Sequence, residues 1–158
     1  MDSIDRQIIA LLRINARQSF REIGERVGLS APAVKRRVDR LEQSGAITGY
    51  GATVNPEALG WPIRAIVALF CEGRMSADEV GALAAGVPEV MAAYTIAGEG
   101  SAILHVLAAD PKHLEHVLAR LREAPGVLRT QTQVVLSTLF ERPLELPTSA
   151  DHGRPAGE

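Results

Sequence analysis

The sequence predicts an α+β protein in two parts, a three-helix domain followed by a βαββαβ domain. Apolar side chains recur at helical spacing through the first 45 residues, with glycines of the kind that end helices. After residue 60, a strand, a capped helix and a second strand follow one another twice. We therefore expect domains at 1–45 and 61–142, joined by an arm and hinge at 46–60.

The first helix is expected to begin at Asp2 or Ser3, because either side chain can accept a hydrogen bond from a free N–H of the first turn. Side chains at i, i+4, i+7 and i+8 then form one apolar stripe that should face the other helices. The members of that stripe are Ile4, Ile8, Leu11 and Leu12.

Two further helices are predicted after the first. Ser19 and Glu22 match the S-x-x-E capping box at the start of the second helix, and Gly28 suits its end. Ser30 is a candidate N-cap of the third helix, with Pro32 in its first turn, where a missing N–H costs little. A short helix, a glycine turn and a second capped helix indicate a helix-turn-helix, whose second helix enters the major groove of DNA.

The third helix is basic in a chain whose net charge is −2. Residues 1–60 hold nine Lys and Arg against seven Asp and Glu, whereas residues 61–158 hold eight against twelve. Between Lys35 and Arg40 there are four positive charges and one negative. This distribution favours DNA binding by one face of each subunit of an oligomer over binding by a general polycation.

Residues 46–54 are expected to form a short strand or hairpin arm, because the β-formers Ile47, Tyr50 and Val54 alternate with glycines. Such an arm would make the first domain a winged-type helix-turn-helix. Residues 55–60 form a polar turn that ends in glycine and is suited to a hinge.

The second half of the chain contains an internal repeat. Each unit is a β-strand, a helix that begins after a Ser or Asp cap, and a second strand, so that the whole predicts a ferredoxin-like α/β sandwich. The last strand is apolar on both faces, as expected where a sheet meets another subunit. Residues 143–158 are rich in Pro and Gly and are expected to form a disordered tail. The elements are predicted at 63–72, 77–85, 91–97, 102–109, 111–123 and 128–139.

Other classes of protein receive little support. Neither an apolar run of membrane-spanning length nor a secretory signal is present, so we expect a cytoplasmic protein without a membrane partner. Cys71 is expected to be an inert core thiol, and His105 a core or interface residue. His113 and His116 lack the further ligands of a metal site. We therefore expect no cofactor, no metal, no catalytic residues and no enzyme activity.

A string of motifs runs from Ile4-Asp5 through E-I-G-x-x-V-G-L-S and V-x-R-L-E-x-x-G-x-I to a G-Y-x-A arm and Leu59-Gly60. Together these motifs resemble the Lrp/AsnC family of bacterial and archaeal transcription regulators. The resemblance implies a ligand-responsive C-terminal domain, called a RAM domain, that dimerises through its sheet. It also implies higher assembly up to octamers, binding of promoter DNA, and an amino acid or related small molecule as effector.

Candidate DNA-binding residues follow from the helix-turn-helix. Arg36 and Arg37 are the best candidates for reading bases, since arginine can bond to both O6 and N7 of guanine. Small residues at the start of the third helix should let the backbone approach the bases, and other polar residues should contact phosphates. The small residues are Ser30, Ala31 and Ala33, and the phosphate candidates are Lys35, Arg40, Arg17, Arg21, Thr48 and Tyr50.

Candidate effector residues follow from the resemblance. The family usually has G-x-x-D at the turn between the second and third strands, where this chain has Gly98, Glu99, Gly100 and Ser101. A serine cannot supply the charge that suits an α-ammonium group. Two functions stay open for this domain, an effector-responsive one and an oligomerising one without an amino-acid effector. An enzyme on this half and a protein-binding three-helix module are weaker alternatives. The resemblance also places Gln133 and Val134 near the cleft.

Overall fold

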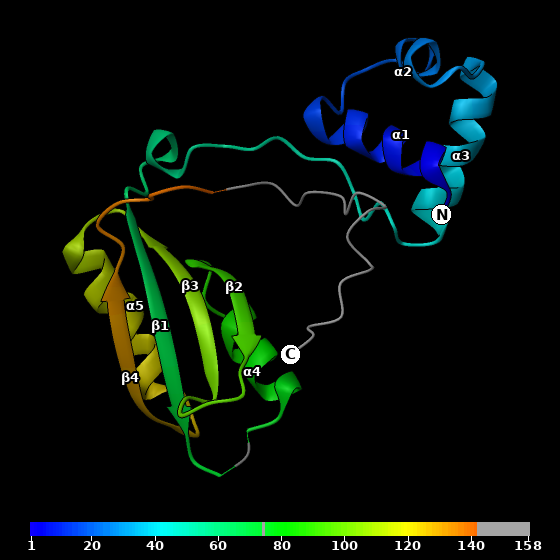
Figure 1. Cartoon of the computed structure of the whole chain (residues 1–158). Helices are drawn as coiled ribbons and strands as arrows, with labels where there is room; N and C mark the ends of the chain where they lie inside the picture. Colours follow the sequence, from blue (N-terminus) through cyan, green and yellow to red (C-terminus); the bar gives the residue numbers. More distant parts are fainter. Residues whose placement is uncertain (74, 142–158) are drawn as a thin grey trace, which may run out of the picture. The chain divides into compact units, whose positions relative to one another are not determined.

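A computed structural model of the chain describes residues 1–73 and 75–141. The described residues divide into two compact units, Met1–Ala52 and Thr53–Glu141 (Figure 1). The division falls inside the segment 46–60 that the sequence predicts as arm and hinge. The predicted tail at 143–158 lies outside the described residues.

The first unit contains three helices around a small apolar core. They are α1 (Ser3–Ile14), α2 (Phe20–Val27) and α3 (Ala31–Gln43). Both predicted N-terminal signals are present, because Asp2 and Asp5 form a capping box on α1 and Ser19 and Glu22 form one on α2. The core consists of side chains from all three helices, namely Ile8, Leu12, Ile23, Val34 and Val38.

The turn between α2 and α3 brings backbone close to backbone. Gly28 ends α2 in the left-handed conformation with φ of 71°, as the sequence predicts. The N–H of Leu29 donates to the carbonyl of Gly24 at 2.9 Å, so the turn folds back over α2. Ser30 occupies the N-cap position of α3, but its side chain makes no capping hydrogen bond, which corrects that part of the prediction.

The arm is not a strand within this chain. Residues 46–54 make no strand pairing, although Ile47 packs against the helical core. An isolated extended segment cannot satisfy its backbone groups in a ladder without a neighbouring strand, and the described part of the chain supplies none here. The short 3₁₀ helix Pro56–Leu59 follows, and Gly60 ends it with φ of 82°.

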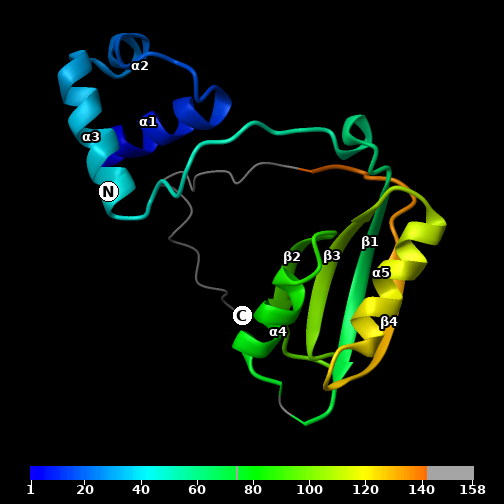
Figure 2. The same cartoon turned by 180° about the vertical axis from the view of Figure 1, so that it is seen from behind.

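The second unit is a four-stranded antiparallel sheet with two helices on one face (Figures 1 and 2). The strand order β2-β3-β1-β4 with the βαββαβ connection gives the predicted ferredoxin-like arrangement. Both helices have the predicted bounds. The elements are β1 (Ile63–Cys71), α4 (Ala77–Ala85), β2 (Val90–Thr95), β3 (Ala102–Ala108), α5 (Pro111–Glu123) and β4 (Val127–Val134).

Strand alternation separates a buried face of the sheet from an outer face. Ala65, Val67 and Leu69 of β1 are buried with the apolar sides of the helices. Their neighbours Ile66 and Phe70 point to the other face, which no described helix covers. His105 lies on that outer face opposite Ile66 and is exposed, so it is not a core residue. Cys71 is only partly buried against the core.

Strands β2 and β4 are shorter than the sequence predicts, because in each case the partner strand stops first. Predicted residues 135–139 of β4 continue past the start of β1, where the last bond is from the N–H of Val135 to the carbonyl of Arg64. Likewise Thr95 pairs with Ala102, the first residue of β3, so β2 ends there. A pattern of apolar residues does not reveal where the partner strand stops.

Gly24→Ala is expected to destabilise the first unit, because the new Cβ would lie 2.3 Å from the carbonyl oxygen of Leu29. The turn must shift to relieve this clash, and we expect a loss of about 1–3 kcal/mol. Hydrogen exchange of the α2 and α3 amides measures the effect on this unit by itself. Gly51→Ala is the control, since its Cβ would meet nothing within 4 Å. Equal protection in both variants would contradict the prediction.

Candidate nucleic-acid interface and effector turn

Helix α3 presents a polar stripe away from the core. Val34, Val38 and Leu41 are buried on one side. At about 100° per residue, Arg36 lies roughly opposite them, on the same face as Gln43. Arg36 is exposed and has no hydrogen bond or ion pair within the described part of the chain. Its guanidinium is therefore available to a ligand.

Arg37 is in a different situation, because it lies on the side of α3 that faces α1. Its Nη1 donates to Asp2 Oδ2 and to Asp5 Oδ1, each at 2.7 Å. Its side chain is 25% exposed and that of Asp5 only 2%. Arg40 donates from Nη2 to both oxygens of Asp5, at 3.2 and 3.3 Å. These contacts engage one nitrogen of Arg37, Nη1, within the protein, so the two candidates for reading bases differ in how freely their guanidinium groups can reach a ligand.

The two carboxylates are stabilised in their charged form. The N–H of Asp5 and then Arg37 lower the pKa of Asp2 below its ordinary value of 3.8. For Asp5, burial raises the pKa, but the N–H of Asp2 and the Arg37 guanidinium outweigh it, and the pKa is also lowered. The same ion pairs, Asp2 first, raise the pKa of Arg37. Asp2, Asp5 and Arg37 are therefore charged, and together with Arg40 we call them the cap cluster.

The remaining candidates on the helices lie at the surface or near it. Lys35 forms an ion pair with Asp39 at 2.6 Å, so part of its charge is already balanced. Ser30 is exposed at the start of α3, where Ala31 and Ala33 are half-buried. Arg17 and Arg21 are exposed outside α3, on the turn before α2 and on its first turn.

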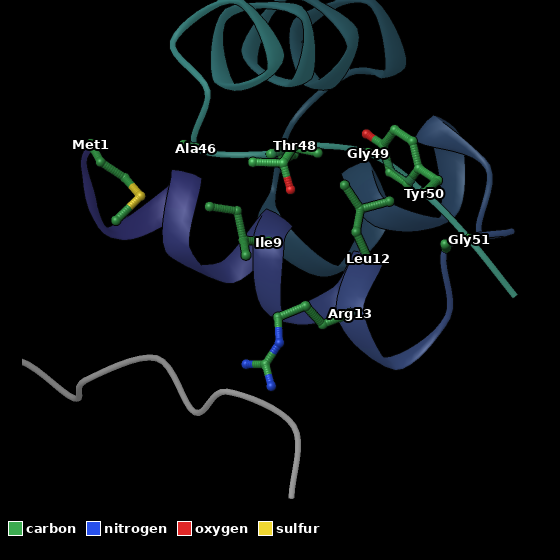
Figure 3. A pocket seen from close by; sticks show the side chains of 11 residues that line it. Met1, Ile9, Leu12, Arg13, Ala46, Thr48, Gly49, Tyr50 and Gly51 are labelled. Atoms are coloured by element: carbon green, nitrogen blue, oxygen red, sulfur yellow. The ribbon is translucent and has the colours of Figure 1, made fainter. Parts of the chain in front are cut away.

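The arm lies beside α1 and borders a hollow of about 540 Å³. Figure 3 shows Ile9, Leu12 and Arg13 along the helix, with Thr48 and Tyr50 on the arm that runs past it. The Tyr50 hydroxyl donates to Glu42 at 2.8 Å. Burial and then this carboxylate raise the pKa of Tyr50 to about 12. The phenol is therefore bound to the end of α3, whereas Thr48 is exposed.

The turn between β2 and β3 is tied to the end of β1 by Ser101. Its N–H donates to the carbonyl of Leu69 at 2.8 Å, and its Oγ accepts from the N–H of Cys71 at 3.1 Å. Glu99 is exposed on the same turn, between Gly98 and Gly100. The hydroxyl of Ser101 is thus already used to hold the turn against the sheet.

Gln133 and Val134 do not meet this turn within one protomer. They pair with Ile66 and Ala65, at least three residues along β1 from Leu69, which corresponds to about 10 Å. Val134 lies opposite the buried Ala65, so it belongs to the helix-covered face and Gln133 to the outer face. The turn and Gln133 are therefore separate places on the sheet within one protomer.

Of the two histidines on α5, His113 takes part in structural contacts. His113 Nδ1 accepts from the N–H of Ala109, and Nε2 lies 3.0 Å from Glu89 Oε1. Arg120 forms a second ion pair with Glu89. Within residues 1–73 and 75–141, no group of three or more His, Cys, Asp or Glu is placed to hold a metal. Nor does any helix of those residues have the length and apolar character to cross a bilayer.

Two family models match the two units. Residues 1–42 match the AsnC-type helix-turn-helix domain, and residues 64–145 match the Lrp/AsnC ligand binding domain.

The chain belongs to the Lrp/AsnC family.

Individual relatives agree with this assignment. The HTH-type transcriptional regulator Rv2324 of Mycobacterium tuberculosis is 49% identical over 142 residues, covering 90% of this chain and 96% of the relative. The feast or famine regulatory protein Rv3291c from M. tuberculosis was solved in complex with L-methionine. It has a TM-score of 0.86 at 36% identity, and the match covers 92% of this chain and 99% of that protein. The structure of AsnC from E. coli has a TM-score of 0.85 at 27% identity, with coverage of 91% and 97%.

This chain is accordingly a helix-turn-helix transcriptional regulator of the Lrp/AsnC type and not an enzyme. The sequence predicted the basic helix at its observed place but not the contacts of Asp2 and Asp5 with that helix. A signal was present, since Asp5 lies at i−3 from Ile8 and i−7 from Leu12 and so belongs to the buried stripe of α1. A carboxylate on a buried stripe requires a cationic partner.

Asp5→Asn is expected to lower the free energy of unfolding at neutral pH by about 1–3 kcal/mol, as for hydrogen bonds to charged groups. Because the folded pKa of Asp5 lies below 3.8, its contribution is complete above that pH and is lost as the pH falls through the folded value. Urea unfolding between pH 7 and pH 2 should therefore show a smaller acid-induced loss for the variant than for the wild type.

The control for charge is Glu25→Gln, which removes an exposed carboxylate from α2. For this control variant we expect the acid-induced loss in free energy of unfolding to equal that of the wild type. If Asp5→Asn had the same free energy of unfolding as the wild type at pH 7, the charge of Asp5 in the cap cluster would contribute nothing to stability.

Proposed function

We propose that this regulator binds its own operator DNA sequence-specifically as a homodimer or larger symmetric assembly, with α3 of each subunit in the major groove. The observation that supports this most directly is the exposed, unpaired Arg36 opposite the buried stripe of α3 in the described part of the chain. Arginine at such a position can bond to O6 and N7 of guanine. The cytoplasm, where such DNA lies, is the proposed location.

The other residues are proposed to contact the DNA backbone. Lys35 and Arg40 lie on α3 near Arg36, and their side chains are 60% and 62% exposed, which suits contacts with phosphates. Ser30 has a hydroxyl free of a capping bond at the start of α3, where N–H groups and the helix dipole favour a phosphate. Arg17, Arg21 and Thr48 would contact phosphates from outside this helix, and Ala31 and Ala33 would allow close approach.

Dimerisation is proposed through the outer face of the sheet. Ile66, Ile103 and Leu107 are only partly covered there, and the exposed Tyr94 packs edge-on against His105 with ring centroids 5.6 Å apart. A hollow of about 530 Å³ lies on the same face, bordered by Leu139 and Phe140. An apolar face of this kind is suited to a second copy of the sheet. A single recognition helix reads too few base pairs to bind tightly alone.

Arg36→Gln is expected to weaken binding of operator DNA by about 1–3 kcal/mol and to relax specificity at one base pair. Fluorescence anisotropy with the promoter of its own gene measures this. Arg13→Gln on α1 removes an exposed arginine of the same charge and serves as control, and light scattering checks that both variants keep a mass of two chains or a multiple. Wild-type protein without salt-dependent binding of that DNA would contradict the proposal.

An amino-acid effector is a second proposal, with a specific weakness in this chain. The relatives solved with L-methionine include Rv3291c and a regulator from Neisseria meningitidis. Here the Ser101 hydroxyl is engaged with the N–H of Cys71, and the exposed Glu99 is the sole carboxylate of the turn. We infer that the turn binds an α-ammonium group weakly, so that this domain acts chiefly in assembly.

Ser101→Asp is expected to raise the affinity for L-methionine at least about tenfold, because a charge-assisted hydrogen bond is stronger than a neutral one. A carboxylate at this position can still accept from the N–H of Cys71. Thermal shift at graded ligand concentrations measures the change, since a ligand of the native state raises the melting temperature. Ser101→Asn is the matched control without the charge. Tight binding of L-methionine by the wild type would contradict the inference.

A further inference from the structure

The cap cluster joins the start of α1 to the middle of the DNA-binding helix. Within the described part of the chain, the Asp5 carboxylate accepts hydrogen bonds from three groups, namely the N–H of Asp2 and the guanidinium groups of Arg37 and Arg40. A buried carboxylate that lost these cations would be strongly unfavourable. The position of Asp5 therefore restricts how α3 can rotate or slide on α1.

Arg37 shows which side of α3 is held. A single nitrogen, Nη1, donates to both carboxylates of the α1 capping box, and three-quarters of the side chain is covered. The residue lies about 100° around the helix from Arg36. Arg37 therefore ties one side of α3 to α1 while Arg36 remains free on the adjacent side.

Arg40 connects the cluster to the surface. Its side chain is 62% exposed, and Nη2 is the one nitrogen that bonds to Asp5. It lies four residues after Arg36, so the two side chains are neighbours on the helix surface. Asp5 thus fixes one end of a guanidinium whose other donors remain accessible beside Arg36.

We propose that Asp2 and Asp5 are positioning residues for DNA recognition, which hold α3 through Arg37 and orient Arg40 toward the phosphates, while Arg37 itself does not contact DNA. This inference rests on the proposed function above. Simple electrostatics predicts the opposite effect on binding. Removal of a carboxylate near DNA should strengthen binding to phosphates, whereas the loss of a positioning residue should reduce the preference for the correct sequence.

The experiment compares operator DNA with a scrambled duplex of equal length, using full-length protein and anisotropy at several salt concentrations. Asp5→Asn is expected to lower the ratio of specific to non-specific affinity about tenfold, with non-specific affinity unchanged or higher. Glu25→Gln removes an equal charge from the same unit without touching α3 and should keep the wild-type ratio. A ratio for Asp5→Asn equal to that of Glu25→Gln would overturn the proposal.

Salt dependence separates positioning from direct contact. If Arg37 bonds only within the protein, Arg37→Gln should weaken specific binding but leave the slope of log K against log salt unchanged. Arg40→Gln should reduce that slope by about 0.9, the value for one lost phosphate contact. In the double variant Asp5→Asn with Arg37→Gln, the loss should be no larger than in the more severe single variant. A reduced slope for Arg37→Gln, or additive losses, would overturn the proposal.

Folding is checked by circular dichroism before any binding measurement. Should Asp5→Asn not fold, Asp2→Asn takes its place, because Asp2 is half-exposed and supplies only one of the bonds to Arg37. For Asp2→Asn, the ratio of specific to non-specific affinity is expected to fall about threefold. A folded Asp2→Asn with the wild-type ratio would then overturn the inference. Wild-type protein that does not distinguish the two duplexes would instead refute the proposed function.

Discussion

The carboxylate of Asp5 is the one buried charge among the described residues, and its need for cations determines how the recognition helix is held. The packing of Ile8, Leu12, Ile23, Val34 and Val38 brings the three helices together, but apolar contacts tolerate small rotations. An ion pair whose donors point at fixed angles does not tolerate such rotations. The cap cluster therefore adds a directional constraint to a core that is too small to provide one alone.

Ion pairs within the first unit also determine which positive charges of α3 remain unbalanced. Its basic helix contains Lys35, Arg36, Arg37 and Arg40, yet Arg37 and Arg40 are paired with the carboxylates of the cap cluster and Lys35 is paired with Asp39. What remains exposed is a narrow stripe centred on Arg36. A helix with so little unbalanced positive charge suits a regulator that, as proposed above, discriminates between DNA sequences without binding all of them tightly.

In the second unit, β1 lies at the centre of the outer face proposed for dimerisation and is bonded to the turn that contains Ser101. Both edges of β1 are paired, with β3 and β4, and its alternating side chains separate a buried core from an apolar outer face. The end of β1 also exchanges two hydrogen bonds with Ser101, whose N–H donates to the carbonyl of Leu69 and whose Oγ accepts from the N–H of Cys71. The proposed dimer face and the turn therefore share one strand, β1.

The sequence by itself determined the order of the five helices and of the four strands after residue 60, every helix cap except that of Ser30, and the family, because periodicity, capping boxes and glycine positions are local properties. The bounds of α4 and α5 were predicted without error for this reason. Only the tertiary structure decided where β4 ends, whether the arm has a strand partner, and which arginine is free. Those questions depend on residues distant in the chain: β1 for β4, and Asp2 and Asp5 for Arg37. Four neighbouring basic residues look alike in the sequence, and they differ only when α1 packs against α3 and one face of the helix meets carboxylates.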